Sequence, residues 1–581
     1  MPQPAAEWDE QWDVVVAGAG AAGMTAALFC AIRNARVLLI EKSDFVGGTG
    51  ALSAGTIWIP NTVHAAEVGA EDTRERAATY LQNVVGNRSG AEMREAFLRN
   101  GPLAVAELEA HSDLKLRAHA YHPDYLSDVE GAALKGRALE PLPFDGRELG
   151  KRFALLRPPL PEFTILGGMM VDRVDIGHLL GVAKSLRSAS HAAKLLLRHV
   201  RDRISHRRGT RLVMGNALIG RLLKSLDARG VEIRTNSHIS RILVDAKGAV
   251  GGVELQGSNG LRKVALSGGL ILAGGGFNRH KQRRQELLSG IDSDWASAAS
   301  GTTGENQDCA LAIGARLGPA ELNAAFLAPV SIRKRRDGST AVFPHFVLDR
   351  GKPGTVVVDR YGKRFVNEAI SYHQFGLAML ASVDRSAIPA FLIADAVAIR
   401  KYGLGMVRPG ARGLKSSIES GYLTAARTTE ELASRLGIDP HTLRESIDRM
   451  NGFAAAGEDT DFGRGSTAYQ RNTGDAAAGG KNPNLGPIAT PPFYALRLYP
   501  SDIGASTGLV TDTAARVLRA GEQPIAGLYA CGNDMQSIMG GVYPGPGITL
   551  GPALTFAYLA ATDAVARAGQ DDQIVVAGKK S

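Results

Sequence analysis

Cysteine, aromatic residues and long apolar runs are all scarce in this chain of 581 residues. Its three cysteines, Cys30, Cys309 and Cys531, lie far apart, which excludes a disulfide framework and a Cys-x-x-Cys metal site. We therefore expect a reducing compartment. No apolar run of about 20 residues occurs, so we expect no membrane-spanning helix. The amino terminus has neither a basic nor an apolar stretch, and we expect no secretory signal and a cytoplasmic location.

The positive charge of the chain is concentrated in one segment. The net charge is +9, and nine Lys/Arg but one Asp lie between Lys184 and Arg211. Apolar residues recur there at helical spacing, which predicts one or two basic amphipathic helices, inserted at about 178–212. Such a helix packs on its own domain with a solvated face, touches the anionic inner face of the cell membrane, or binds a protein partner. No nucleic-acid-binding motif accompanies the charge.

The amino-terminal segment has the pattern of a dinucleotide-binding unit. The apolar residues 13–17 predict a buried strand, and Gly18-Ala-Gly20-Ala-Ala-Gly23 opens a predicted helix. Residues 37–40 predict a second strand that ends at Glu41. This order of elements is typical of a dinucleotide-binding unit: a strand, a glycine turn, a helix, a second strand and an acidic residue. The pyrophosphate is then expected at the helix N-terminus and the ribose at Glu41.

Further glycine clusters favour FAD over NAD. Residues 47–60 form a second small-residue loop soon after Glu41, and Ala273-Gly-Gly-Gly276 ends a third predicted strand. A Gly-Asn pair, Gly532-Asn533, follows near the carboxy terminus. A long, bent cofactor that is contacted at several points along the chain explains all of these clusters together. Residues 47–60 contain no histidine, so we expect non-covalent FAD.

A rigid turn near the carboxy terminus carries a single phenol. Its sequence is Tyr543-Pro-Gly-Pro-Gly547-Ile-Thr-Leu-Gly551. The prolines fix φ and the glycines let the backbone approach a ligand closely. Such a turn can direct one hydroxyl and one backbone N–H at the same point, which is the donor pair that a ketone oxygen needs as it gains negative charge.

Together these motifs resemble the flavoprotein family of 3-ketosteroid Δ1-dehydrogenases, within the succinate dehydrogenase/fumarate reductase flavoprotein group. The resemblance covers nearly the whole chain, and the turn at residues 543–547 is its most specific part. Fumarate reductases carry His and Arg that clamp a dicarboxylate, and the carboxy-terminal region has no such set.

The resemblance implies a role for each of a few residues. Tyr543 and the N–H of Gly547 hold the substrate carbonyl, and Tyr372 removes the α-proton. Either Tyr125 or Tyr121 supports that base by a hydrogen bond that favours the tyrosinate. The β-hydride goes to flavin N5. The implied reaction is 1,2-desaturation of a 3-ketosteroid, in steroid metabolism and lipid degradation; the alternatives are desaturation of a smaller cyclic ketone and reduction of an activated double bond.

The motifs and the resemblance together give the expected FAD site, with no metal site and an unknown electron acceptor. Its residues are Gly18, Gly20, Ala22, Gly23, Glu41, Lys42, Gly48, Thr49, Gly50, Ser53, Gly55, Thr56, Ile239, Ala273, Gly274, Gly275, Asn306, Gly532, Asn533, Asp534, Thr549 and Leu550.

A chain of this length exceeds one simple core, so we expect two domains. The fold class is α/β: a discontinuous Rossmann-like FAD-binding domain at 1–325 and 498–581, with an inserted α+β substrate domain at 326–497. Within the latter, the Gly-, Asp- and Asn-rich residues 458–489 predict a long surface loop. The last helix, residues 550–568, is expected to close the flavin site.

Overall fold

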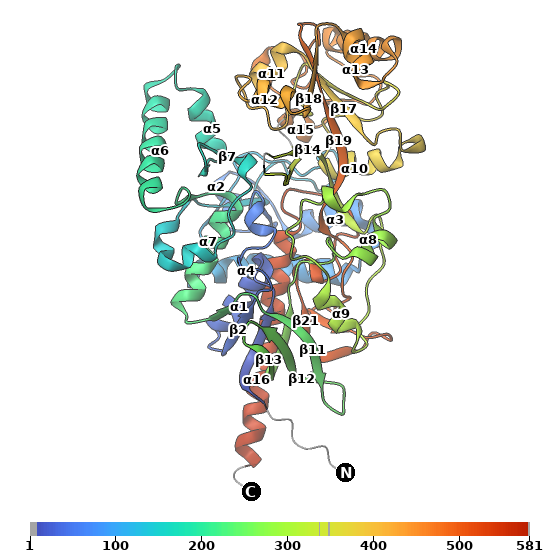
Figure 1. Cartoon of the computed structure of the whole chain (residues 1–581). Coiled ribbons are helices and arrows are strands. Elements are labelled where there is room, and N and C mark those ends of the chain that lie inside the picture. The colour runs from blue at the N-terminus through green and yellow to red at the C-terminus, as the bar shows by residue number, and fades with distance from the viewer. Residues whose placement is uncertain (1–7, 336, 347–348, 579–581) are drawn as a thin grey trace.

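The computed structural model describes residues 8–335, 337–346 and 349–578, with side chains to residue 569 in the last helix. Most of the amino-terminal stretch that carries the expectation of no signal therefore lies outside the described residues. Two sheets with helices packed around them organise the chain, and the fold is of mixed α/β type (Figure 1). In the described part, no helix is both long and apolar enough to cross a bilayer.

The larger sheet contains the amino-terminal unit. Strand β1 (Glu10–Ala17) lies between β2 (Val37–Ile40) and β13 (Gly260–Leu272), and all three run parallel. The parallel part continues to β10 (Glu232–Arg234) beside β2 and to β21 (Pro524–Ala530) beside β13. The central segments 14–17, 37–40 and 270–272 are buried and apolar, as expected for parallel strands that are covered on both faces. The antiparallel strands β11, β12 and β20 complete this sheet: His238–Val244, Val250–Gly257 and Arg516–Leu518.

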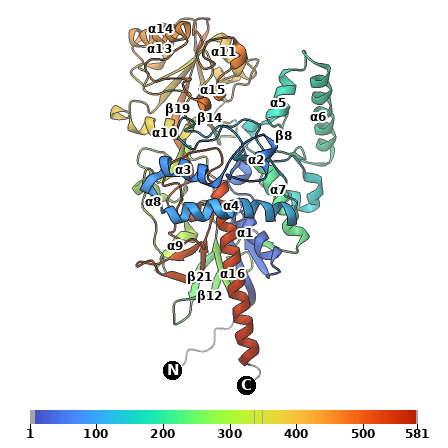
Figure 2. The ribbon, with the colours of Figure 1, turned by 180° about the vertical axis from the view of Figure 1, so that it is seen from behind.

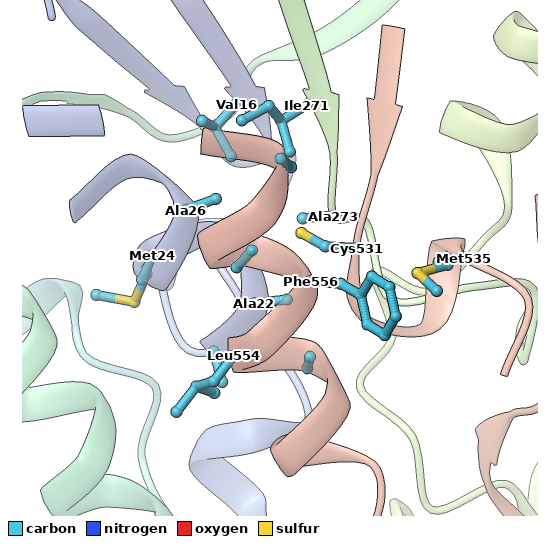
Figure 3. Close-up of a cluster of buried hydrophobic side chains, with 14 of the residues drawn as sticks. Val16, Ala22, Met24, Ala26, Ile271, Ala273, Cys531, Met535, Leu554 and Phe556 are labelled. Atoms are coloured by element: carbon cyan, nitrogen blue, oxygen red, sulfur yellow. The ribbon is translucent and has the colours of Figure 1, made fainter. Parts of the chain in front are cut away.

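Helices α1 (Ala21–Ile32) and α16 (Leu550–Gly578) form the core on one face of this sheet. Figure 3 shows Ala22 and Ala26 of α1 beside α16, and Phe556 of α16 pointing toward Met535, with Cys531 close by. Small residues let the helices approach closely. Cys531 is therefore a buried packing residue, and burial raises the pKa of its thiol well above the ordinary value.

The smaller sheet is antiparallel and comes from the middle of the chain. Its order is β15-β14-β19-β17-β16, with β18 also on β19. The bounds are Thr340–Pro344 (β15), Ala325–Lys334 (β14), Phe493–Ala505 (β19), Ala390–Ala394 (β17), Thr355–Val358 (β16) and Leu423–Ala426 (β18). Strand β19 was expected to return toward the FAD-binding domain at about residue 497. It instead pairs with β14 up to Ala505, so this sheet extends past the expected boundary.

The prediction of a surface loop at 458–489 is wrong. Helix α15 (Ala468–Thr473) lies within it, and Arg464 and Tyr469 are buried. The polar residues of the segment bond internally: Arg464 donates to the carbonyls of Thr355 and Lys352, both at 2.7 Å. Composition alone could not distinguish polar groups paired inside the protein from polar groups facing water.

The basic segment forms α5 (Arg173–Leu180) and α6 (Leu186–Ser205), which stand at one side of the molecule (Figures 1 and 2). The remaining helices are α2 His64–Glu67, α3 Arg74–Val85, α4 Ala91–His111, α7 Met214–Ala228, α8 Lys281–Leu287, α9 Glu305–Leu311, α10 Tyr372–Ala381, α11 Ala396–Tyr402, α12 Leu414–Glu419, α13 Thr429–Leu436 and α14 Pro440–Ala456. The remaining strands are β3 Ile57–Trp58, β4 Leu116–Ala118, β5 Ala138–Pro141, β6 Phe144–Asp145, β7 Thr164–Ile165, β8 Met169–Met170 and β9 Arg211–Leu212.

Candidate active site

Four parallel strands end at one edge of the larger sheet, and a cavity begins there. The strands end at Ala17, Ile40, Leu272 and Ala530. Ligands of open parallel sheets bind outside the carboxyl ends of the strands. The cavity has a volume of about 510 Å³ and continues from this edge to Tyr125, Tyr372, Tyr543 and Gly547. All but two of the residues expected to bind FAD line it.

Gly23 and Ile239 are the two exceptions. A Cβ on Gly23 would lie 1.8 Å from the carbonyl oxygen of Gly18, so this glycine serves close helix–strand packing. Ile239 is buried in the core, and its neighbours Ser237 and His238 line the cavity instead. Adjacent side chains of a strand point to opposite faces, so the Ile239 side chain faces the core while that of His238 faces the cavity.

The glycine turn fits a pyrophosphate. A Cβ on Gly20, the residue before α1, would meet no atom within 4 Å and would enter the cavity. Gly18 has φ of +113° and lies against Ala273, whose carbonyl oxygen would be 2.3 Å from an added Cβ. The first turn of α1 therefore presents its free N–H groups to the cavity without a side chain in between.

Two buried carboxylates hold the loops around the cofactor part of the cavity. Glu41 accepts from the backbone N–H of Ala19 at 3.0 Å and of Ser43 at 2.9 Å. Asp534 accepts from Gly274 at 2.5 Å and Gly276 at 2.9 Å. Glu41 thus joins the loop after β2 to the turn after β1, and Asp534 joins the segment after β21 to the loop after β13.

The carboxy-terminal turn is fixed against the amino-terminal half of the chain. The Pro544 carbonyl accepts from the Tyr80 hydroxyl at 2.7 Å and from the Tyr125 backbone N–H at 2.8 Å. Gly547 has φ of +92°, and a Cβ there would lie 2.3 Å from the Thr56 carbonyl oxygen. Within the described residues the N–H of Gly547 has no acceptor, so it is free to donate to a ligand.

Three tyrosines from distant parts of the chain meet beside this turn. Ring centroids lie 5.5 Å apart for Tyr125 and Tyr372, 5.8 Å for Tyr125 and Tyr543, and 5.2 Å for Tyr372 and Tyr543. The Tyr125 hydroxyl donates to the Tyr372 hydroxyl at 3.2 Å. Tyr121 is 44% exposed and does not line the cavity, so Tyr125 is the tyrosine placed beside Tyr372.

Helix α10 sets the position of Tyr372, its first residue. Ser371 caps the helix by accepting from the N–H of Gln374. His373 accepts from the N–H of Leu327 at 3.0 Å through Nδ1, so its Nε2 donates to the Gly541 carbonyl at 2.8 Å. Burial lowers the pKa of His373 to about 4, which keeps it neutral in this role. The helix and the carboxy-terminal turn are thereby joined.

Burial raises the pKa of Tyr372 and Tyr125 well above the ordinary value. A buried cation lies on the same side of the cavity. Arg350 donates to the carbonyls of Phe346 at 3.0 Å and Ile370 at 3.2 Å, and its charge lowers the pKa of Tyr125 and Tyr469. The charge of Arg350 favours a tyrosinate in this cluster and opposes the effect of burial.

Sequence reasoning missed Arg350 and Tyr469. The Tyr469 ring lies 4.6 Å from that of Tyr125, and the Tyr469 hydroxyl is buried without a partner in the described part of the chain. No local motif marks either residue, because both reach the site through contacts between distant segments. In the same described residues, no group of three or more His, Cys, Asp or Glu is arranged to hold a metal ion.

Comparison with known proteins agrees with this geometry. The model of the FAD binding domain family matches residues 13–550. A solved 3-ketosteroid Δ1-dehydrogenase from Sterolibacterium denitrificans, in complex with 1,4-androstadiene-3,17-dione, superposes with a TM-score of 0.89 at 32% identity, covering 96% of this chain and 100% of the other. The chain belongs to this FAD-dependent family.

Two curated relatives of this chain are named for different substrates. The 3-oxosteroid 1-dehydrogenase of Mycolicibacterium smegmatis is 35% identical over 96% of this chain and 98% of its own. The 4-oxocyclohex-2-ene-1-carboxylate 5-dehydrogenase of Sinomonas cyclohexanicum is 37% identical over 95% and 93%. The fold is that of FAD-binding flavoenzymes of the succinate dehydrogenase/fumarate reductase type, and the protein is an FAD-dependent oxidoreductase.

Proposed function

We propose that this protein desaturates the carbon pair next to a ring ketone, and that its substrate is a 3-ketosteroid converted to the 1,2-unsaturated product. The observation that carries the proposal is the meeting of Tyr372, Tyr543 and the free N–H of Gly547 on one cavity that begins at the dinucleotide-binding strand ends. The steroid relatives support the choice of substrate.

Tyr543 and Gly547 hold the ketone oxygen in this proposal. The hydroxyl and the N–H are fixed by a turn that is buried on both sides, so they need no reorganisation as charge develops on the oxygen. Phe326 packs edge-on against Tyr543, with ring centroids 5.1 Å apart, and Tyr543 is buried. Donors in a dry site stabilise charge more strongly than donors in water.

Tyr372 removes the α-proton in this proposal, and Tyr125 donates a hydrogen bond to it. The donated bond at 3.2 Å stabilises the phenolate that acts as base. Arg350 provides the nearby positive charge. Tyr543 thus stabilises the carbonyl oxygen and Tyr372 removes the proton. Enolisation needs both functions, whether it is concerted or stepwise.

FAD is held by the glycine turn of α1, by Glu41 and by the strand ends that Asp534 joins. When bound, it would supply the acceptor for the hydride that leaves the β-carbon. The attachment is proposed to be non-covalent. We also propose the domain division at 1–325, 326–497 and 498–581, in which the inserted unit carries Tyr372 on α10.

Anaerobic mixing of the FAD-loaded protein with 4-androstene-3,17-dione tests this function. We expect the flavin absorbance to bleach in a single exponential and the product to gain one double bond in ring A. A flavin spectrum unchanged by every cyclic ketone tried, but reoxidised by fumarate after chemical reduction, would contradict the proposal in favour of a double-bond reductase.

A smaller cyclic ketone is the second candidate substrate. The relative at 37% identity is named for a one-ring keto acid, and its identity exceeds that of the steroid relatives. The same residues would perform the same chemistry. Bleaching by 4-oxocyclohexanecarboxylate at a higher kcat/KM than by 4-androstene-3,17-dione would favour this candidate.

We further propose that α6 contacts an anionic membrane surface from the cytoplasmic side. One row of its apolar residues faces away from the protein: Leu186 is 91% exposed and Ile204 is 83% exposed, with Leu197 and Val200 between them on the same side, whereas Ala192 and Leu195 are buried. Spacings of 11 and 18 residues are about three and five turns, so these side chains form one stripe. Arg187, Lys194 and Arg201 flank it, as in helices that lie in a membrane interface.

Flotation with vesicles tests the membrane contact. We expect the protein to float with vesicles that contain phosphatidylglycerol at low salt. It should remain at the bottom in 0.5 M salt or with neutral vesicles, because the attraction of each Lys or Arg to anionic lipid, about 1 kcal/mol, is screened by salt. The pair Leu197→Ser with Ile204→Ser should lose flotation, whereas the control pair Leu103→Ser with Val383→Ser, also exposed, should not. Wild-type protein that stays in the aqueous fraction at low salt would refute the contact.

A further inference from the structure

The part of the cavity beyond the tyrosines has a polar end. His119 and His122, which follow β4, line it together with Arg173 from the first turn of α5. The His119 and His122 rings lie 5.2 Å apart, and the His122 ring lies 6.5 Å from that of Tyr125. This end of the cavity therefore borders the tyrosine cluster at Tyr125.

The acidic groups at this end are already paired. Glu140 lies 2.6 Å from Arg117 and 3.3 Å from His119, Asp172 lies 3.3 Å from Arg211, and Asp349 lies 2.6 Å from His345. Each of these three carboxylates already has a basic partner, so none is free to pair with Arg173.

Arg173 and His122 differ from these pairs. The Arg173 side chain is exposed at the cavity, and over the described ranges it makes no hydrogen bond and no ion pair. The Nδ1 atom of His122 is buried and has no partner in the same ranges. Burial, aided by the charges of His119 and Arg173, lowers the pKa of His122 to about 3. The ring is therefore neutral at pH 7 and offers one N–H donor beside an uncompensated guanidinium.

We propose that Arg173 and His122 form a subsite for a carboxylate, so that the preferred substrate is a cyclic ketone with an acidic group remote from its carbonyl. The inference rests on the proposed desaturation and adds the anionic end of the substrate. The guanidinium and the imidazole N–H are the donors that a carboxylate accepts from, and charge-assisted bonds of this kind are about twice as strong as neutral ones.

The cavity also has apolar walls that suit the hydrocarbon body of such a substrate. Leu160, Phe163, Val171, Ile176 and Phe343 line this part of the cavity. The Phe163 and Phe343 rings are stacked at 5.1 Å and close one side. Two kinds of molecule have this chemistry: a one-ring keto acid, and a 3-ketosteroid whose far end carries a carboxylate.

Matched acids and esters test the subsite. The one-ring pair is 4-oxocyclohexanecarboxylate and its methyl ester, and the steroid pair is 3-oxo-4-androstene-17β-carboxylate and its methyl ester. The measured quantity is the ratio of kcat/KM for acid over ester, from anaerobic flavin bleaching. We expect a ratio of about ten or more in the wild type for the pair that matches the native substrate, and a ratio near one for Arg173→Met.

Two further variants separate the subsite from a general charge effect. Arg99→Met removes an exposed arginine on α4 and should leave the wild-type ratio. Arg173→Lys should keep part of the preference, because it keeps the charge and loses the bidentate geometry. His122→Phe, whose FAD spectrum reports on folding, should lower the ratio as well.

The outcomes are distinct. A preference for the acid in one pair identifies the one-ring or the steroid source, and its loss in Arg173→Met supports the subsite. Equal use of acid and ester by the wild type, or an acid preference that survives in Arg173→Met, would overturn it. If no ketone of either pair bleaches the flavin, the proposed desaturation itself fails, and that result is separate from failure of the subsite.

Discussion

Replacing Tyr372 with Phe should reduce kcat by about 10³-fold or more while FAD stays bound. The variant removes the hydroxyl that takes the α-proton, and a positioned base contributes about 10²–10⁴-fold. Tyr372 is buried, and its ring packs 4.9 Å from Phe346, so the phenylalanine ring fills the same space. Rapid-mixing measurement of flavin bleaching checks the result, and the flavin spectrum before mixing reports on the fold.

The matched control is Tyr121→Phe. Tyr121 is four positions from Tyr125 in the chain but is exposed. The substitution should therefore leave the rate of flavin bleaching unchanged. Bleaching by Tyr372→Phe at a tenth of the wild-type rate or faster would reject the assignment of the base.

The pH dependence of the wild type has a definite sign under the same assignment. Burial raises the pKa of Tyr372 well above its ordinary value, so the phenolate is the minor form at neutral pH. The bleaching rate should therefore rise with pH across the neutral and alkaline range, because each step upward increases the basic fraction. In Tyr372→Phe this rise should be absent.

Replacing Tyr543 with Phe should reduce kcat by about 10²–10³-fold, the loss measured when one donor to a developing oxyanion is removed. The effect should be smaller than that of Tyr372→Phe, because the Gly547 N–H still donates to the ketone oxygen. The ring of Tyr543 stays packed against Phe326, so FAD binding should persist.

Ketone affinity separates the two tyrosine variants. A saturated ketone that cannot be desaturated should bind Tyr543→Phe more weakly and Tyr372→Phe nearly as well as wild type, measured as the perturbation of the flavin spectrum. Equal loss of binding in both variants would contradict the separate roles, as would Tyr543→Phe with wild-type kcat.

The amino-terminal unit could be predicted closely because its signals are local. Strand, glycine turn and helix are contiguous, and strand β2 has the bounds that the apolar run 37–40 gave. The glycine clusters at residues 47–60, 273–276 and 532–533 all reach the cavity, because parallel strands place their carboxyl ends at one edge.

The substrate part of the site was harder to predict because it depends on contacts between distant segments. Tyr469 lies in the segment 458–489, whose composition predicted a loop. Arg350 lies outside that segment, and it is held by the carbonyls of Phe346 and Ile370. The polar end with His122 and Arg173 was also missed. His122 comes from the loop after β4 and Arg173 from the inserted helices, and the fold alone brings them together.

The basic segment was predicted as helical, and its outward face follows from the structure. Apolar spacing alone is compatible with burial against the protein. Ala192 and Leu195 are buried whereas Leu197 is exposed, which places the stripe on the outer side. Periodicity gives the stripe but not the side on which the rest of the molecule lies.

An experimental structure of the FAD-loaded protein with the dienone product 1,4-androstadiene-3,17-dione tests the central claim most directly. The account predicts the C3 ketone oxygen within hydrogen-bond distance of both the Tyr543 hydroxyl and the Gly547 N–H, with the Tyr372 hydroxyl beside C2. A product bound with that ketone at the His122 and Arg173 end, away from both donors, would contradict it.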